Sequence, residues 1–166
     1  MWSRLSGWLP ALCVGIIVCV YVWAQARYLT PGCSEVDTAG YLALAERMEQ
    51  GEPLAQPDDD IFIHQDHVWV ENQRGETIPK YTPGLPALMA LGLRLHGESG
   101  AFAVSPVAGA LALVGAYLLF HLWMSRWAAV LALLALAFNP MYRVYTDYPL
   151  AHAADLCCIT WGMYFL

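Results

Sequence analysis

Three short segments carry the side chains best suited to chemistry. Asp37 follows the first long apolar segment, residues 80–86 (KYTPGLP) precede another, and Asp147 lies in the sequence TDYP at 146–149. A carboxylate can accept a proton from a hydroxyl, and a cation such as Lys80 can stabilise a departing phosphate. These residue types favour proton transfer and anion stabilisation, provided that the fold brings the segments to the same side of the molecule.

The distribution of charge predicts which elements position these segments. The chain has 166 residues, of which 58% are hydrophobic and only 13% charged, whereas about a quarter of the residues of soluble domains are charged. Twelve of the 14 acidic residues lie in 28–99, between long uncharged segments. This composition excludes a disordered chain and a secreted disulfide scaffold. The net charge of −6 argues against nucleic-acid binding. A membrane protein remains.

The uncharged segments predict transmembrane helices. About 20 helical residues cross a hydrocarbon core of roughly 30 Å. The third uncharged segment, residues 127–142, is too short for this. It can be extended through Arg143, whose long side chain reaches the interface. A fourth apolar segment, residues 148–166, is interrupted by His152 and Asp155 and stops at the last residue. A helix that ended there would leave its last carbonyls unpaired in lipid. We therefore expect an N-terminal fragment of a larger protein, with spans at about 5–27, 101–123, 127–143 and 149–166.

The first apolar segment has a second interpretation as a signal peptide. Arg4 precedes it, and residues 24–26 (AQA) have the small-x-small form of a cleavage site. The segment is long, however, and Trp8 and Trp23 lie near its ends, as in an anchor that stays in the membrane. We favour the retained anchor.

The polar region 28–99 has the pattern of a structured loop. Apolar residues at helical spacing, ended by Gly51 and Pro53, predict an amphipathic helix at about 35–50 on the outer leaflet. Two strand-like segments, 67–70 and 77–80, flank a glycine turn and predict a β-hairpin.

A second interfacial helix is predicted at about 84–95, where a dozen apolar residues are too few to cross. If it does not cross, the weak positive-inside bias of Arg4 and Arg126 places 28–99 and 140–150 outside. Counting it as a span would put the two polar loops on opposite faces. The predicted fold is an all-α membrane protein, a multi-span helical bundle with a structured extracytoplasmic loop that carries amphipathic helices and a small β-hairpin.

This order of features resembles the GT-C glycosyltransferases, including bacterial relatives of the dolichyl-phosphate-mannose protein mannosyltransferases and of the lipid A aminoarabinose transferase. It comprises a span, an outer loop with an Asp-led helix, a Tyr-x-Pro-Gly-x-Pro helix, a further span, a basic turn, Asn139-Pro140 and Thr146-Asp147. The resemblance implies transfer of a sugar from a polyprenyl-phosphate carrier to a lipid, glycan or protein. It also implies a multi-pass protein of the bacterial inner or cell membrane, with its active face outside the cytoplasm.

By position, the resemblance makes Asp37 the catalytic base and Asp147 the second acidic residue. Many relatives have adjacent acids in the first loop, whereas here Val36 separates Glu35 from Asp37, so either acid fits. The remaining predicted substrate-binding residues surround the proline motif: Lys80, Tyr81, Pro83 and Gly84. The transferase pattern places a lysine directly before Pro-Pro, where this chain has Thr82, so Lys80 departs from it. No cofactor is assigned, no metal ligand is assigned, and a divalent cation stays open because carboxylates bind such ions.

Simpler roles compete with these assignments. Asp37 could cap a helix and Asp147 could favour a helix dipole. His64 and His67 would point to opposite faces of a strand, which disfavours a shared metal ion. A transporter or flippase of a lipid-linked substrate would use His152 and Asp155 along its path, and a non-catalytic membrane protein would use the acidic loop to bind a partner.

Overall fold

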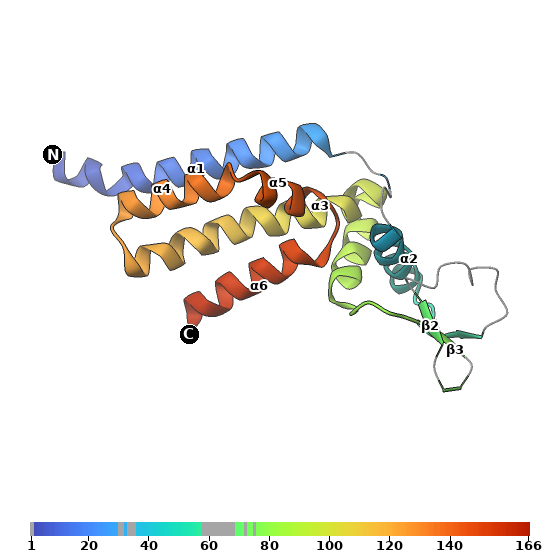
Figure 1. The fold of residues 1–166 in the computed structure, drawn as a ribbon. Helices are drawn as coiled ribbons and strands as arrows, with labels where there is room; N and C mark the ends of the chain where they lie inside the picture. The colour runs from blue at the N-terminus through green and yellow to red at the C-terminus, as the bar shows by residue number, and fades with distance from the viewer. Residues whose placement is uncertain (1, 30–31, 33–35, 58–68, 72, 75) are drawn as a thin grey trace. The chain divides into compact units, whose positions relative to one another are not determined.

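The structure is a computed structural model that describes residues 2–29, 32, 36–57, 69–71, 73–74 and 76–166. Two compact units divide the chain: unit 1 contains residues 1–29 and 105–166, and unit 2 contains residues 30–104. The described elements, drawn in Figure 1, are α1 (Trp2–Tyr28), α2 (Val36–Gln50), β1 (Gln56–Pro57), β2 (Trp69–Glu71), β3 (Glu76–Pro79), α3 (Gly84–Trp123), α4 (Arg126–Ala137), α5 (Pro140–Asp147) and α6 (Ala151–Phe165).

The core of unit 1 lies between its helices. Residues of α1 at helical spacing, Val14, Ile17 and Tyr21, are buried in one cluster with Val130 and Leu133 of α4. Figure 1 shows α1 and α4 running alongside each other. Because α1 supplies part of this core, it is packed as an integral element of unit 1.

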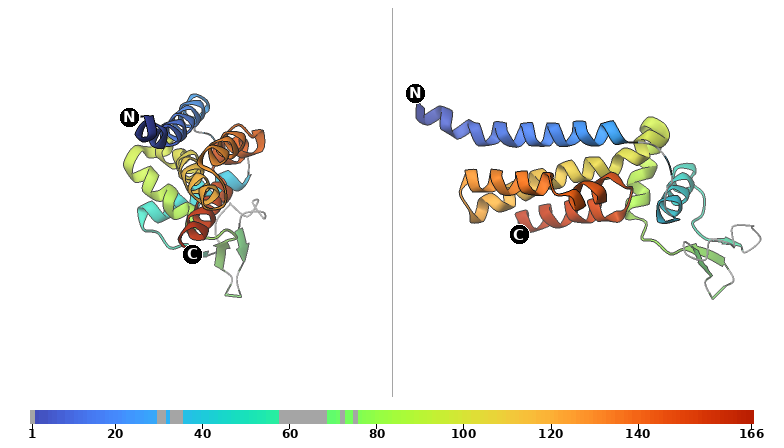
Figure 2. Two further views of the ribbon diagram at one scale, coloured as in Figure 1. Left: turned by 90° about the vertical axis from the view of Figure 1, so that its left-hand side faces the viewer. Right: turned by 45° about the horizontal axis from the view of Figure 1, so that its top comes forward.

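Small residues of α3 let other helices approach it closely. A Cβ atom at Gly109 would overlap Thr146 of α5, and one at Gly115 would crowd Thr160 of α6. The Tyr142 hydroxyl donates to the Gly109 carbonyl at 2.6 Å, so α5 is fastened to the backbone of α3. Both views in Figure 2 show α6 beside the 105–123 part of α3, where the indole of Trp161 donates to the Leu111 carbonyl at 3.1 Å. Small-residue packing of this kind is typical of membrane helices.

The segment predicted as one span over 127–143 forms two helices instead. α4 ends at Ala137, α5 begins at Pro140, and the two meet at 62°. Proline has no N–H for the preceding turn, and the Asn139 side chain accepts from the backbone N–H groups of Met141 and Tyr142 at 2.9 and 3.3 Å. The Asn-Pro pair thus ends one helix and starts the next, and residues expected in an outer loop after 140 are helical.

Two helices are long and apolar enough to cross a membrane, Trp8–Tyr28 and Gly84–Trp123, and a third candidate arises if α4 and α5 are taken as one bent span. α6 has 15 residues, or about 22 Å of helix, which is shorter than a hydrocarbon core. The helical fold is therefore confirmed together with two candidate spans, and the predicted bundle of four crossings stays a prediction.

The long helix α3 is sharply kinked within unit 2. Helical geometry breaks at His96 (φ −144°, ψ 20°) and at Gly97 (φ 63°), a positive φ that glycine adopts without steric cost. Gly92 and Gly100 then face each other so closely that a Cβ on either would overlap the backbone of the other. In a straight helix these positions would lie about 12 Å apart. The predicted separation of helix 84–95 from the following helix is confirmed.

The predicted hairpin is present and has a third strand. β2 and β3 pair antiparallel, with Val70 opposite Ile78, and β1 pairs with the other edge of β3 through Gln56 and Thr77. The strand order is therefore β1-β3-β2. The contribution of β1 was not predicted, because two residues are too short for an alternating pattern.

α2 forms where amphipathic spacing predicts it and ends in a turn at Gly51 (φ 73°). Its apolar face, however, is buried in protein: Leu44 and Ala45 are fully buried and Tyr41 is 8% exposed. That face is therefore not free to lie on a leaflet. The outward apolar stripe of unit 2 belongs to the next helix and consists of Leu88, Leu91 and Leu95.

Candidate functional site

The first candidate site lies in unit 2 around Asp37, in the first turn of α2. Its exposed carboxylate accepts a hydrogen bond from the Tyr81 hydroxyl. The ring of Tyr81 also packs against that of Tyr41, with centroids 4.6 Å apart and planes inclined by 42°. Asp37 and Tyr41 are four residues apart and so share one side of the helix. The structure thus brings together two predicted site residues, Asp37 and Tyr81, and adds Tyr41.

Tyr81 is held in place by the elements on either side of it. β3 ends at Pro79 and α3 begins at Gly84, so the residue lies in a short connection between a strand and a helix. The Pro83 carbonyl accepts from the Ala87 N–H at 2.9 Å, so Pro83 and Gly84 form the start of α3. Lys80 is exposed, and its side chain makes no ion pair or hydrogen bond within the described residues. Tyr81 is the residue of this segment that donates a hydrogen bond to Asp37.

The environment of Tyr81 favours its neutral form. Partial burial, followed by the hydrogen bond and the negative charge of Asp37 and by Tyr41, raises the pKa of Tyr81 to about 12. Near neutral pH the phenol is therefore a hydrogen-bond donor and the carboxylate is its acceptor. A hydroxyl-bearing ligand that reached Asp37 would exchange one O–H donor for another.

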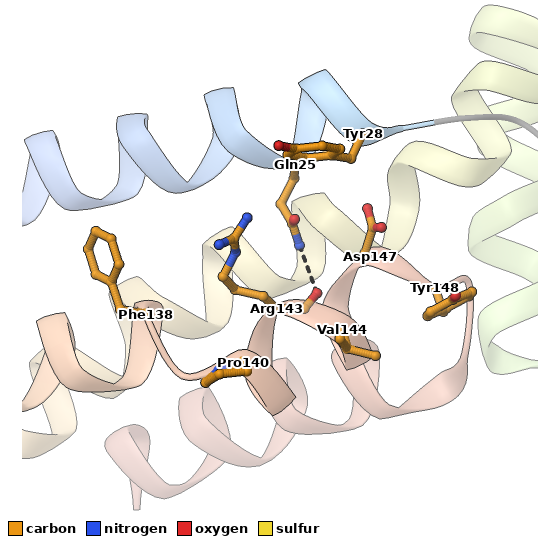
Figure 3. A pocket seen from close by; sticks show the side chains of 8 residues that line it. All are labelled: Gln25, Tyr28, Phe138, Pro140, Arg143, Val144, Asp147 and Tyr148. Atoms are coloured by element: carbon orange, nitrogen blue, oxygen red, sulfur yellow. Dashed lines mark hydrogen bonds between the residues drawn. The ribbon is translucent and has the colours of Figure 1, made fainter.

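The second candidate site is a groove in unit 1 between α1 and α5, with a volume of about 420 Å³. Figure 3 shows the residues that line it. They are the polar or aromatic Gln25, Tyr28, Arg143, Asp147 and Tyr148, and the apolar Phe138, Pro140 and Val144.

Gln25 joins the two walls of this groove. Its side chain is 3% exposed, and its amide Nε2 lies 3.0 Å from the Thr146 hydroxyl, 3.1 Å from the Arg143 carbonyl and 3.3 Å from the Tyr21 hydroxyl. The Thr146 hydroxyl donates in turn to the Tyr142 carbonyl at 2.8 Å. These bonds fix the last turn of α5 against α1.

Arg143 and Asp147 lie one helical turn apart on α5, on either side of Gln25 in Figure 3. Oδ1 of Asp147 is buried and has no hydrogen-bond partner among the described residues. Within the same part of the chain, neither side chain forms an ion pair at 4.0 Å or less. The groove therefore presents one cation and one acceptor, both directed toward α1 and both available to a ligand.

Asp37 belongs to unit 2 and Asp147 to unit 1, and each site is described by itself. Their meeting in one pocket stays a prediction. Glu35, the alternative acid, lies outside the described residues, as do His64 and His67. In the part of the chain that is described, no three His, Cys, Asp or Glu side chains gather in a way that would hold a metal ion.

Sequence reasoning missed three residues of these sites: Gln25, Tyr41 and Arg143. Tyr41 is one of the residues whose helical spacing predicts the amphipathic helix, and Arg143 was expected at the membrane interface. A signal for Gln25 and Arg143 was nevertheless present, because polar side chains in apolar helices usually have a partner or a ligand.

Comparison with known proteins adds no relative: no family model, no curated protein and no solved structure matches this chain.

Proposed function

We propose that this protein is a membrane glycosyltransferase that takes a sugar from a polyprenyl-phosphate carrier and transfers it to a lipid, glycan or protein acceptor. Its membrane is a bacterial cell membrane, and its active face lies outside the cytoplasm. The observation that carries the proposal is the hydrogen bond from Tyr81 to Asp37. It joins the Asp-led helix to the Tyr-x-Pro-Gly-x-Pro segment, two features on which the resemblance to the GT-C enzymes rests.

In the proposed reaction, an acceptor hydroxyl displaces the Tyr81 hydroxyl from Asp37. The carboxylate takes the acceptor proton as the acceptor oxygen bonds to the anomeric carbon of the sugar. The bond between that carbon and the phosphate oxygen breaks, and the polyprenyl phosphate leaves with the electron pair. The resemblance implies Asp147 as a second acidic residue, and a cationic side chain stabilises the departing phosphate.

One observation favours a second candidate, a transporter or flippase of a lipid-linked substrate. The 62° break between α4 and α5 lies in an apolar region, and discontinuous helices are common at the substrate sites of transporters. The path expected through His152 and Asp155 has less support, because both side chains are exposed, and His152 packs edge-on against Tyr145 at 5.1 Å.

Reconstituted vesicles containing a polyprenyl phosphate that carries a radiolabelled sugar test the first candidate. We expect release or transfer of the label by the unaltered protein and at least a hundredfold slower release by Asp37→Asn, which lacks the proton acceptor. Glu46→Gln is the matched control, because Glu46 is an exposed acid on the same helix, and it should retain full activity.

Full activity of Asp37→Asn would remove Asp37 from the mechanism. Movement of the labelled lipid between leaflets, without cleavage of the sugar, would favour the transporter instead.

A further inference from the structure

The groove of unit 1 has two features that no residue of the described chain satisfies. The guanidinium of Arg143 has no anionic partner within 4.0 Å there, and the buried Oδ1 of Asp147 has no donor. Burial of an unpaired polar group costs free energy, so the Asp147 oxygen favours a ligand that brings a hydrogen-bond donor. The guanidinium of Arg143 favours a ligand that brings an anion. The ligand must therefore carry an anion and a hydrogen-bond donor.

The spacing of these two groups restricts the ligand further. Four residues along a helix rise about 6 Å, and Figure 3 shows both side chains directed toward α1. An anion and a donor one helical turn apart suit a phosphate and a hydroxyl on the group it esterifies. A hydroxyl reaches Asp147 without the repulsion that a second cation would meet from Arg143.

The groove also has apolar walls. Phe138 is 60% exposed and Val144 is 48% exposed, and both line the same groove as Arg143. Exposed apolar side chains beside an unpaired cation fit a hydrocarbon chain that begins at a phosphate. A water-soluble phosphate would leave these side chains uncovered.

We propose that the groove binds a lipid-borne phosphodiester whose head group carries hydroxyls. Arg143 binds the phosphate, Asp147 accepts from a head-group hydroxyl, and the acyl or prenyl chain lies over Phe138 and Val144. Gln25 is a positioning residue, because it holds the Arg143 carbonyl and Thr146 and so fixes the turn that carries both contacts. This inference rests on the proposed function only where it identifies the bound lipid with the sugar donor, and it can be tested by binding alone.

Native mass spectrometry of the full chain, released from micelles with equal amounts of three lipids of matched acyl chains, tests this assignment. Phosphatidylglycerol offers hydroxyls, phosphatidylethanolamine an ammonium, and phosphatidylcholine no donor. We expect phosphatidylglycerol to be retained about tenfold over phosphatidylcholine, as one charge-assisted hydrogen bond allows. Asp147→Asn should bring this ratio toward one, because only the hydroxyls offer Asp147 a donor. Arg143→Gln should weaken retention of both lipids about tenfold, because both carry the phosphate, while Arg143→Lys keeps part of the retention.

Arg126→Gln is the matched control, because Arg126 is an exposed arginine at the start of α4, outside the groove. Arg143→Gln leaves intact the backbone carbonyl that Gln25 binds, and circular dichroism checks that helicity is retained. If this variant does not fold, the salt dependence of the unaltered protein decides, because an ionic contact must weaken as salt rises.

Three results would overturn the proposal. They are equal retention of phosphatidylglycerol and phosphatidylcholine, preference for phosphatidylethanolamine over both, and equal losses for Arg143→Gln and Arg126→Gln. Equally tight binding of soluble glycerol phosphate would overturn the lipid assignment. Specific lipid retention without any transfer of sugar would leave this site in place and reject the glycosyltransferase.

Discussion

The two candidate sites differ in the state of their carboxylates. Asp37 in unit 2 is exposed but already accepts a hydrogen bond from Tyr81. Asp147 in unit 1 has a buried oxygen without a partner in the described chain. A carboxylate with an internal donor is held in one orientation until a substrate hydroxyl replaces that donor. A carboxylate without one offers an acceptor to a ligand. The contrast separates a group suited to proton transfer from a group suited to recognition.

The largest effect should come from disrupting unit 2 at the kink of α3. Gly92→Ala would force a Cβ into the backbone of Gly100, and we expect a loss of about 3 kcal/mol in the free energy of unfolding. Titration with sodium dodecyl sulfate measures this loss. Gly15→Ala is the control, because a Cβ at Gly15 meets no atom within 4 Å. Equal stability of the two variants would contradict the close approach.

The second-largest loss of stability is expected in unit 1. Gln25→Ala removes the donor shared by Thr146 and the Arg143 carbonyl, and we expect a loss of about 2 kcal/mol. The same titration measures it, with the exposed Gln50→Ala as control. The phenol titration of Tyr81 should be unchanged in this variant. If Gln25→Ala lost no more stability than Gln50→Ala, the hydrogen bonds of Gln25 would not be what holds α5 against α1.

A smaller effect is expected at the break between α4 and α5. Asn139→Ala removes the cap of α5 and should cost about 1 kcal/mol. Ser125→Ala removes the cap of α4, which is a single bond to the Ala128 N–H at 3.3 Å, and should cost less. The pair is compared by thermal unfolding in micelles. A larger loss for Ser125→Ala would contradict the assignment of Asn139 as the stronger cap.

The smallest effect concerns Tyr81, and it is measurable only at alkaline pH, where the phenol titrates. Its pKa is raised from 10.0 to about 12, so the contribution of its neutral form to stability is complete below pH 10 and is lost as the pH rises through 12. Ultraviolet difference absorbance of tyrosinate should show this late titration, and Tyr81→Phe should remove it. Asp37→Asn should move it to lower pH, and an unchanged titration in that variant would show that Asp37 does not act on the phenol.

Local pattern predicted most of the elements and few of the contacts. The ends of α2, the β2–β3 hairpin and the separation of helix 84–95 follow from glycine, proline and periodicity, which act over a few residues. The 62° break at Pro140 was missed because an apolar segment of that length suggests one span, although the Asn-Pro pair that causes the break was recognised as a motif.

The sites themselves depend on contacts between distant residues. Tyr81 is 44 residues from Asp37, and Gln25 is 121 residues from Thr146. Periodicity gives the face of a helix on which a residue lies but not the element that meets that face. For this reason Asp37 could be selected from the sequence as a candidate. Its hydrogen-bond donor Tyr81, and the hydrogen bonds of Gln25 that hold the last turn of α5, could be identified only in the folded chain.

The close contact of Gly92 with Gly100 constrains the length of the chain as well as its composition. Adding or removing one residue between them would turn one glycine by about 100° around its helix axis and bring a larger neighbour into the contact. Insertions and deletions in this stretch should therefore be rejected even where each substitution on its own is accepted. In a scan of single-residue deletions along α3, we expect the greatest loss of folded protein for deletions between Gly92 and Gly100.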